Sequence, residues 1–315
     1  MTAEVAVVVL THDRAAELLR SLERLRALPE RPRVVVVDNG SSDGTAALVA
    51  ARHAEVEVIA LPDNRGAAGR NAGVRRVEAP YVAFCDDDTW WAPGSLARGA
   101  ALLARHHRLA LLTGRVLVGR EERLDRTCAA MARSPLPRAP DLPGPSVLGF
   151  LAAATMVRRD VFLAAGGFEP GFFLGGEEWL LAIDLARAGW GLAYVDDVVV
   201  HHAPSRRRDG AGRRALLVRN ALWCAWMRRP LGTALRQTAA AVAAAPRDPA
   251  VVRGVLGALG GLGWALNRRR VVPPWLEAQL RRLDPPIAPL ARGRRAPAAA
   301  RLGAQVTPAV RPPSG

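Results

Sequence analysis

The chain has 315 residues, half of them apolar, and its formal net charge at pH 7 is +15. This length and apolar content predict one large core with an appendage. Its three cysteines, Cys85, Cys128 and Cys224, are too few and too scattered to form a disulfide framework or a cysteine metal site, so we expect a reducing cytoplasm. The apolar run over residues 5–10 lacks a basic leader and is too short for a signal peptide.

Positive charge is concentrated in the last third of the chain. From Ser205 onward there are 21 arginines and four acidic residues, whereas the part before it is nearly neutral. Such a cationic region predicts contact with an anionic surface, which can be a membrane, a nucleic acid or a lipid phosphate.

The first half alternates between strand and helix patterns. Four apolar runs predict buried strands, at residues 5–10, 34–37, 56–59 and 81–85. The three helices predicted between them are one that follows Asp13 as its cap, one over residues 45–52 and one over residues 66–77. Continuous apolar strands alternating with helices predict an α/β fold with a mostly parallel sheet that helices cover on both faces.

The carboxyl ends of these predicted strands carry polar residues. Thr11, Asp38 and Asp86 each directly follow a strand. Ligands of parallel sheets bind in the crevice beyond the carboxyl ends of the strands. We therefore expect these three side chains to lie along one edge of the sheet.

The second half predicts mixed elements and then a change in composition. Strands are predicted at residues 109–118 and 192–200, and helices within residues 90–107, 159–165 and 177–188. Residues 133–145 contain five prolines and predict a loop. The later segments 213–227 and 231–245 are helical and carry arginines, and residues 250–266 are too short, and too interrupted by Arg253, for a membrane span. These patterns predict three parts: an α/β domain over residues 1–204, a basic helical extension over 205–283 and a disordered tail over 284–315.

Three consecutive aspartates, Asp86, Asp87 and Asp88, end the fourth predicted strand. Their carboxylates repel one another, so a cation is needed to hold them close. Carboxylate oxygens suit Mg²⁺ or Mn²⁺, and such an ion keeps positions for the oxygens of a substrate phosphate. The alternative is an acidic turn in contact with solvent only.

Two further segments could hold a nucleotide. Asp38 begins the turn Asp-Asn-Gly-Ser, where its carboxylate can accept hydrogen bonds from a base or a ribose; the alternative is a simple helix-capping turn. Residues 66–73 form a glycine-rich helix start, of a kind that favours phosphate. In that segment Arg70 could pair with a diphosphate and Asn71 could reach a base or a sugar.

In their order and spacing, residues 7–14, 36–45, 66–73 and 86–88 resemble the family 2 nucleotide-sugar glycosyltransferases of GT-A fold. The resemblance extends from about residue 4 to residue 202. It implies that Asp38 contacts the base of the donor, that Asp86 lies near the ribose and the metal, and that Asp88 binds the metal, with Asp87 in a supporting role. Thr11, Arg70 and Asn71 complete the implied nucleotide-sugar site.

The same resemblance implies a catalytic base at Glu178, the second member of an acidic pair with Glu177 at a helix start. The helical phase agrees, because Glu178 shares a face with the apolar Leu181 and Leu185. The family usually has aspartate where this chain has Glu178. The alternative is an acidic first turn that complements the helix dipole.

A histidine after the late strand completes the metal site in similar transferases, and of the pair His201–His202 we predict His201 as the ligand. The alternative is a polar strand end.

Together, the resemblance implies an inverting, metal-dependent transfer of a sugar from a nucleoside-diphosphate sugar to the hydroxyl of a glycan or lipid-linked acceptor, in cell-surface polysaccharide or glycolipid synthesis. Two other functions are open: a metal-dependent nucleotidyltransferase, although residues 11–14 lack a basic phosphate loop, and a non-enzymatic nucleic-acid binder, which leaves the acidic positions without a role.

For the cationic last third we expect peripheral attachment to the cytoplasmic leaflet of the cell membrane, and no nucleic acid as partner. Arginine beside tryptophan suits a membrane interface. The residues concerned are Arg206, Arg207, Arg208, Arg213, Arg214, Leu216, Leu217, Leu222, Trp223, Trp226, Arg228 and Arg229. The alternative is an extension that packs on the catalytic domain or on another subunit.

Overall fold

The structure is a computed structural model that describes residues 5–204 and 210–284, without the side chains of residues 210 and 211. Residues 285–315, which are nearly all of the predicted tail, lie outside the described residues, as do Arg206, Arg207 and Arg208.

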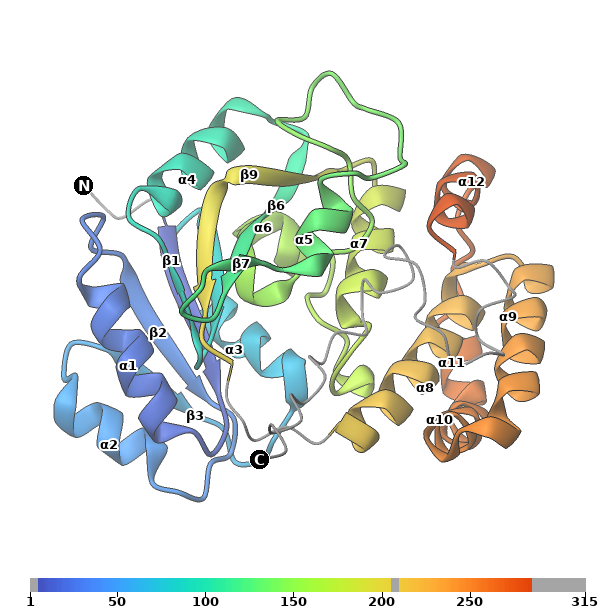
Figure 1. Cartoon of the computed structure of the whole chain (residues 1–315), viewed down its shortest axis with the longest axis horizontal. Coiled ribbons are helices and arrows are strands. Elements are labelled where there is room, and N and C mark those ends of the chain that lie inside the picture. Colours follow the sequence, from blue (N-terminus) through green and yellow to red (C-terminus); the bar gives the residue numbers. More distant parts are fainter. Residues whose placement is uncertain (1–4, 205–209, 285–315) are drawn as a thin grey trace, which may run out of the picture.

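The first half forms four parallel strands that helices flank (Figure 1). The strands, in spatial order from the edge of the sheet, are β3 (Glu57–Ala60), β2 (Arg33–Asp38), β1 (Val5–Thr11) and β4 (Tyr81–Asp86). The helices between them are α1 (Ala15–Arg26), α2 (Thr45–Arg52) and α3 (Arg70–Arg76), the last preceded by the 3₁₀ turn η1 (Gly66–Gly69). The side chains of β1, β2 and β4 are almost entirely buried, which explains their continuous apolar sequence.

The sheet continues beyond β4 with mixed strand directions. The strand order is β3-β2-β1-β4-β8-β6-β9-β5, and β7 pairs with β6. The later strands are β8 (Thr155–Arg158), β6 (Leu109–Val118), β9 (Gly191–His202), β5 (Thr89–Trp91) and β7 (Arg123–Leu124). Strand β8 is antiparallel to β4 and β6, and β9 is parallel to β6. The predicted α/β architecture is confirmed.

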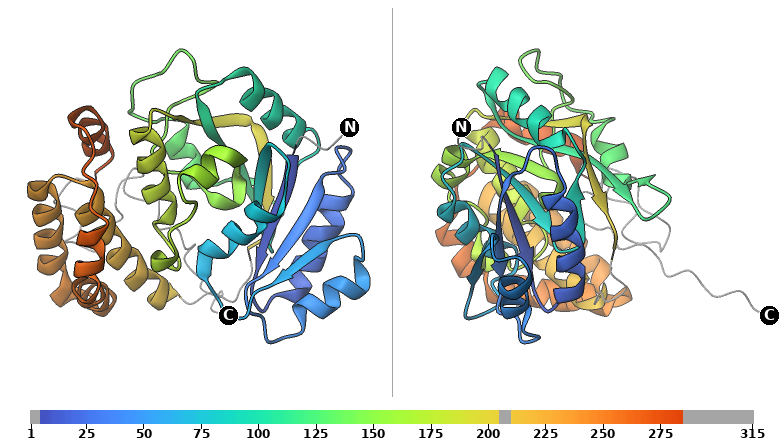
Figure 2. Two further views of the ribbon diagram at one scale, coloured as in Figure 1. Left: turned by 180° about the vertical axis from the view of Figure 1, so that it is seen from behind. Right: turned by 90° about the vertical axis from the view of Figure 1, so that its left-hand side faces the viewer.

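The remaining helices of this domain lie around the sheet (Figure 2). They are α4 (Ser95–Arg105), α5 (Arg126–Met131), α6 (Arg159–Ala164) and α7 (Glu177–Arg187), with the 3₁₀ turns η2 (Ala152–Ala154) and η3 (Pro170–Phe172). Strand β5 was not predicted, because three residues that follow three aspartates carry no periodicity. The prediction of Asp13 as a helix cap is wrong: Asp13 has φ of 52°, and its carboxylate accepts a hydrogen bond from Ser42 N instead.

The last described residues form helices, of which α8 packs against α7 (Figure 1). They are α8 (Gly210–Arg228), α9 (Leu231–Ala244), α10 (Pro249–Gly260), α11 (Leu262–Asn267) and α12 (Pro274–Leu283), with the turn η4 (Ala245–Arg247). Leu222 and Trp223 of α8 belong to the same buried cluster as the sheet. The Trp223 ring lies 6.1 Å from the ring of Phe172 and 5.0 Å from that of Trp264. The extension is therefore packed into the core of the molecule.

Several residues expected at a membrane are buried in this packing. Arg228 donates to both carboxylate oxygens of Asp184 on α7, at 2.6 and 2.8 Å. Arg229 pairs with Glu277 and Asp284. Internal contacts thus occupy Leu222, Trp223, Arg228 and Arg229. For these four residues the structure agrees with the alternative, an extension that packs on the catalytic domain. Within residues 5–204 and 210–284, no helix is long and apolar enough to cross a membrane.

Candidate active site

The carboxyl ends of the first parallel strands bring the predicted acidic residues to one edge. In the strand pairing Thr11 lies opposite Asp38, and Leu10 lies opposite Asp86. The predicted alignment of Thr11, Asp38 and Asp86 is confirmed.

The Asp87 side chain points into the protein interior rather than toward the edge of the sheet. Thr11 Oγ1 donates to its Oδ2 at 3.2 Å, Arg14 NH1 donates to its Oδ1 at 3.1 Å, and Ser21 Oγ donates to its backbone oxygen at 2.7 Å. Burial raises the pKa of Asp87 to about 7, because the neighbouring acidic residues add to desolvation while Arg14 opposes both. Asp87 and Thr11 thus support the acidic triplet from below, and Thr11 is only 2% exposed.

Asp86 and Asp88 occupy different surroundings. The Asp86 side chain is 43% exposed and forms an ion pair with Arg70, whose own side chain is 6% exposed. The Asp88 side chain is 3% exposed; its Oδ2 lies 3.5 Å from Arg14 NH1 and its Oδ1 lies 3.5 Å from His202 Nε2. A cationic side chain therefore faces each of these carboxylates.

The prediction of His201 as the histidine beside the acidic triplet is corrected to His202. Successive side chains of a strand point to opposite faces, so only one member of the pair can face Asp88. His201 Nδ1 lies 3.3 Å from Glu122 Oε1, and the His201 ring stacks on Trp90 with centroids 5.4 Å apart. The strand pairing places His202 opposite Thr89, directly after Asp88.

The turn after β2 is tied to the glycine-rich segment. Asp38, which is buried, accepts a hydrogen bond from Ser41 N at 3.1 Å. Asn39 Nδ2 donates to Gly66 O at 2.9 Å, and Asn39 Oδ1 accepts from Arg65 N at 2.9 Å. Asp38 is thereby held in a fixed turn at the sheet edge.

Asn71 does not face the edge in the predicted way. Its Nδ2 donates to Phe168 O at 2.8 Å, and its Oδ1 accepts from Phe168 N at 2.9 Å. Both ends of the amide are used on one backbone unit 97 residues away in the chain. Asn71 therefore fixes the segment that leads to α7, whereas its neighbour Arg70 forms an ion pair with Asp86.

The acidic pair begins α7, as predicted, directly after Gly176 with φ of 92°. Glu177 is 3% exposed, and its Oε2 has no hydrogen-bond partner among the described residues. Burial raises the pKa of Glu177 well above its ordinary value, and the charge of Glu178 adds to the shift. Burial also raises the pKa of Glu178, while Arg70 and Arg213 lower it and Asp86 raises it. Glu178 thus shares an electrostatic environment with the acidic edge.

The loop before α7 is held by contacts from distant parts of the chain. Asn220 of α8 is fully buried, and its Nδ2 lies within hydrogen-bond distance of three loop carbonyls: Phe172 O at 2.8 Å, Leu174 O at 3.2 Å and Gly175 O at 2.5 Å. Ala67 N donates to Phe173 O at 2.6 Å. These bonds set the position from which Glu178 starts its helix.

A close approach completes this support. Gly66 has φ of 58°, and a Cβ at this position would overlap the carbonyl oxygen of Phe173. Phe173 itself has φ of 60°, which is costly for an aromatic residue. The bonds to Ala67 and Asn220 on either side of this loop offset that cost.

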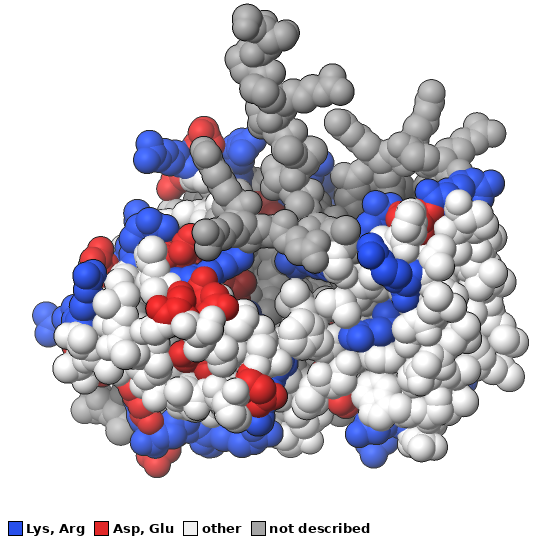
Figure 3. Space-filling model, turned by 90° about the horizontal axis from the view of Figure 1, so that it is seen from below, with Lys and Arg blue, Asp and Glu red and all other residues white. Residues whose placement is uncertain are grey.

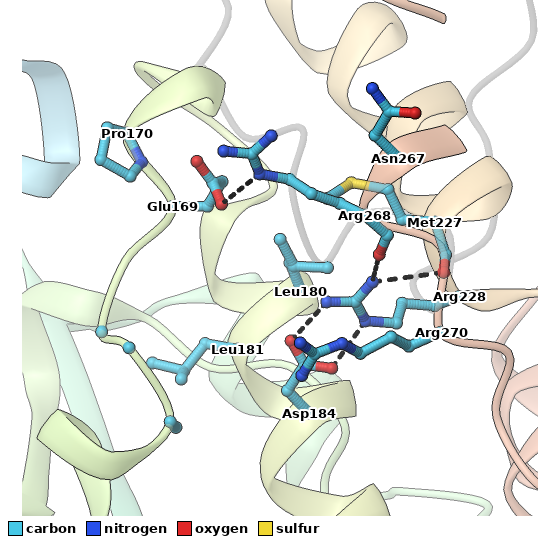
Figure 4. Close-up of a pocket in the computed structure, with 13 residues that line it drawn as sticks. Glu169, Pro170, Leu180, Leu181, Asp184, Met227, Arg228, Asn267, Arg268 and Arg270 are labelled. Carbon is cyan, nitrogen blue, oxygen red and sulfur yellow. Dashed lines mark hydrogen bonds and ion pairs between the residues drawn. The ribbon is translucent and has the colours of Figure 1, made fainter. Parts of the chain in front are cut away.

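Two pockets of the structure lie beside the carboxylates of Asp86, Asp88 and Glu178 rather than directly over them. One, of about 270 Å³, lies between α7 and the extension, where Arg228 reaches Asp184 and Arg268 NE lies 3.7 Å from Glu169 (Figure 4). Because its charged groups are largely paired with one another, it is a packing seam. The other, of about 480 Å³, is lined by the outer face of α3 and by Asn64, Arg65 and Phe173.

The predicted Mg²⁺ or Mn²⁺ site requires donor side chains that lie close together. Among the described residues no group of three or more His, Cys, Asp or Glu stands close enough to hold an ion. Asp88 Oδ1 and His202 Nε2 are 3.5 Å apart, near the roughly 3 Å that separates adjacent ligands at metal distances of about 2.1 Å. The spacing of this pair would suit two ligands of one divalent ion, and Asp86, two positions before Asp88, lies at the same edge.

Sequence reasoning missed four residues of this site. Arg14 and Arg213 act on the acidic groups, but arginines are frequent throughout the chain and gave no distinct signal; His202 lies beside Asp88, and the sequence gave no reason to prefer it to His201. Asn220 did carry a signal: it is an uncharged polar residue inside the otherwise apolar or arginine-bearing run of α8.

Known proteins similar to this chain agree with one another. A family model described as Glycosyl transferase family 2 matches residues 6–164. The N-acetylglucosaminyl-diphospho-decaprenol L-rhamnosyltransferase of Mycobacterium tuberculosis is 29% identical over 251 residues, a match that covers 68% of this chain and 81% of that protein.

Solved structures share the fold. The mannosyltransferase PcManGT from Pyrobaculum calidifontis, in complex with GDP-Man and Mn²⁺, superposes with a TM-score of 0.54 and 21% identity, covering 95% of this chain and 78% of that chain. GalNAc-T7 with UDP, GalNAc and Mn²⁺ superposes with a TM-score of 0.62 and 14% identity, covering 88% of this chain and 56% of that chain. Both neighbours have the GT-A architecture.

Proposed function

The chain belongs to glycosyl transferase family 2, and we propose that it moves a sugar from a nucleoside-diphosphate sugar to an acceptor hydroxyl with inversion at the anomeric carbon. One observation carries this proposal. The strand ends with Asp38 and Asp86 form one edge, and Glu178, from a helix about 90 residues later, is close enough for Asp86 and Arg70 to act on its pKa.

Donor binding is assigned to the sheet edge. Asp38 accepts hydrogen bonds from the base, because its turn holds the carboxylate at the end of β2. Arg70 pairs with Asp86 before the donor arrives. A diphosphate at this point would compete for the same guanidinium, so Arg70 serves as an anion ligand that is already oriented.

A divalent cation, Mg²⁺ or Mn²⁺, would be held by Asp88 and His202, with Asp86 beside them. When bound, it supplies positive charge that offsets the charge developing on the departing nucleoside diphosphate. Arg14 and Asp87 keep Asp88 in place from the protein side. The solved structures of PcManGT and GalNAc-T7 contain Mn²⁺, which supports this assignment.

Glu178 is assigned as the general base. It takes the proton of the acceptor hydroxyl as the hydroxyl oxygen forms its bond to the anomeric carbon and the bond from that carbon to the diphosphate breaks. The base must be ionised to act, and Arg70 and Arg213 favour that form against burial. Burial raises the pKa of the neighbouring Glu177 well above its ordinary value, and this favours the neutral form of that carboxyl.

The acceptor is assigned to glycans or lipid-linked glycans of the cell surface. The name of the mycobacterial relative describes transfer to a decaprenol-linked sugar, and further relatives from Rhizobium meliloti are named for succinoglycan biosynthesis. We place the reaction on the cytoplasmic side of the membrane, where nucleotide sugars are available.

A donor screen tests the proposal. The full chain is incubated with a panel of nucleoside-diphosphate sugars, with Mn²⁺ and with a chelator, and melting temperature and nucleoside-diphosphate release are followed. We expect one donor to stabilise the protein in the presence of Mn²⁺, and Asp88→Ala to lose that stabilisation while it keeps its melting temperature without ligand. No stabilisation by any donor, or an unchanged response in Asp88→Ala, would overturn the assignment.

A further inference from the structure

Exposed apolar side chains are concentrated on one part of the molecule. Eleven large apolar residues are exposed in the described chain, and nine of them lie between Leu231 and Trp275. The two others, Leu124 and Phe173, lie on the α/β domain. The nine are Leu231, Leu235, Val242, Val252, Leu256, Leu259, Leu266, Val271 and Trp275.

These side chains form the outward faces of neighbouring helices. On α10, Val252, Leu256 and Leu259 recur every three to four residues and so share one face. That face is opposite the buried one, where Gly254 packs against Val218 of α8. On α9 the exposed Leu231, Leu235 and Val242 follow the same spacing. Helices α9 and α10 pack against each other, so their exposed apolar faces lie on the same part of the molecule.

The charge around this apolar face is positive. Helices α8–α12, residues 210–284, contain 13 arginines and three acidic residues. Each acidic residue is already paired: Asp248 with Arg214, Glu277 with Arg229 and Arg281, and Asp284 with Arg229. The exposed Arg236, Arg253 and Arg282 are therefore left with positive charge that no acidic residue of these helices offsets.

Seen from below, the part of the molecule that carries these helices shows a broad uncharged surface with basic side chains along its borders (Figure 3). Exposed leucines and a tryptophan next to unneutralised arginines are typical of segments that lie in a membrane interface: the apolar groups enter the acyl boundary and the guanidinium groups meet lipid phosphates.

We propose that the apolar face of α9 and α10, together with Trp275, binds the surface of an anionic lipid bilayer. The face is defined as Leu231, Leu235, Val242, Val252, Leu256 and Leu259. It differs from the set expected from the sequence, since Leu222, Trp223, Arg228 and Arg229 are buried. Excess positive charge argues against a second copy of the chain as the occupant, because two such faces would repel each other.

Vesicle flotation of the full chain tests this binding. Vesicles of phosphatidylcholine alone are compared with vesicles of equal parts phosphatidylcholine and phosphatidylglycerol. We expect flotation with the anionic vesicles only. Leu256→Ser with Leu259→Ser should lower binding by about tenfold or more, and Arg236→Gln with Arg253→Gln by ~10-fold. The control is Leu124→Ser, which changes an exposed leucine on the α/β domain and should bind like the unchanged chain.

Two further measurements keep the interpretation clear. The melting temperature of each variant shows whether it is folded, and sedimentation without vesicles reports its oligomeric state. Equal flotation by the leucine variant and the Leu124→Ser control would overturn the proposal. So would a dimer of the unchanged chain that the leucine substitutions dissociate, because the face would then belong to self-association. Sugar transfer to a water-soluble acceptor should be the same in all these variants, which separates this test from that of the proposed function.

Discussion

The two sides of the candidate active site differ in how far along the chain their supports lie. On the sheet side, Asp38 and Asp86 stand at the ends of adjacent strands, and the pairing of β1 with β2 and β4 fixes their alignment. On the loop side, the backbone before Glu178 is held by Asn71 and by Asn220. The strand register alone therefore aligns the residues of the sheet edge. The position of the loop before Glu178 depends instead on a few long-range hydrogen bonds.

Substitution of Glu178, on the loop side of the site, should have the largest effect. Glu178→Gln removes the proton acceptor at nearly constant shape, so we expect kcat to fall by about 10²–10⁴-fold with little change in the KM for the donor. Glu177→Gln is the matched control, because burial raises the pKa of that carboxyl and disfavours its charged form, and it should lose less than about tenfold. Steady-state release of nucleoside diphosphate measures both. Equal losses in the two variants would contradict the roles assigned to the pair.

Substitution of Asn220, which supports the loop before Glu178 from α8, should have the next largest effect. Asn220→Leu removes the side-chain donor of Leu174 O and Gly175 O, at a cost of roughly 1–3 kcal/mol for each group that stays unpaired, whereas Phe172 O keeps its bonds from Leu174 N and Arg219. We expect lower stability in urea and a fall in kcat that exceeds the change in donor affinity.

The control for that support is Gln237→Leu, which removes an amide of α9 that bonds only to Asp284. We expect it to change stability by about 1 kcal/mol or less and to leave kcat unaltered. If Asn220→Leu lowers stability but retains full kcat, the loop does not need α8 to position Glu178.

On the sheet side, the two histidines can be compared directly. His202→Ala should weaken Mn²⁺ binding in the presence of a nucleoside diphosphate by about 10–100-fold, by analogy with the loss of partners around metal ligands. His201→Ala removes only an exposed contact with Glu122 and the stack on Trp90, so metal affinity should stay nearly constant. Isothermal titration measures both affinities. The reverse order would restore His201 as the ligand.

The smallest predicted effect is the contribution of Glu177 to the pH dependence of stability. The folded-state pKa of Glu177 is raised above its unfolded value, so its contribution to stability is full below the ordinary glutamate range and is lost as pH rises through the raised pKa. Glu177→Gln removes this loss. The melting temperature of Glu177→Gln relative to the unchanged chain should therefore increase with pH above that range. A difference independent of pH would show that Glu177 is ionised in the folded protein.

The same contrast explains what could be predicted from the sequence. The sheet side was predictable, because continuous apolar runs locate buried strands and the polar residue after each run must lie at the edge, as Thr11 and Asp38 do. The choice between His201 and His202 was not, since it depends on which face β9 presents after a register shift in its pairing with β6. Asn220 was missed because nothing local tells a buried amide in a helix which backbone, 45 to 48 residues away, it will bond.

Asn220 also sets an order of events during synthesis. Chains emerge from the ribosome N-terminus first, and the sheet edge can assemble from the first half of the protein. The loop before Glu178 acquires its amide donor only when α8, which begins more than 30 residues after Glu178, has left the exit tunnel and folded back. A nascent chain therefore lacks these loop hydrogen bonds until α8 has been made.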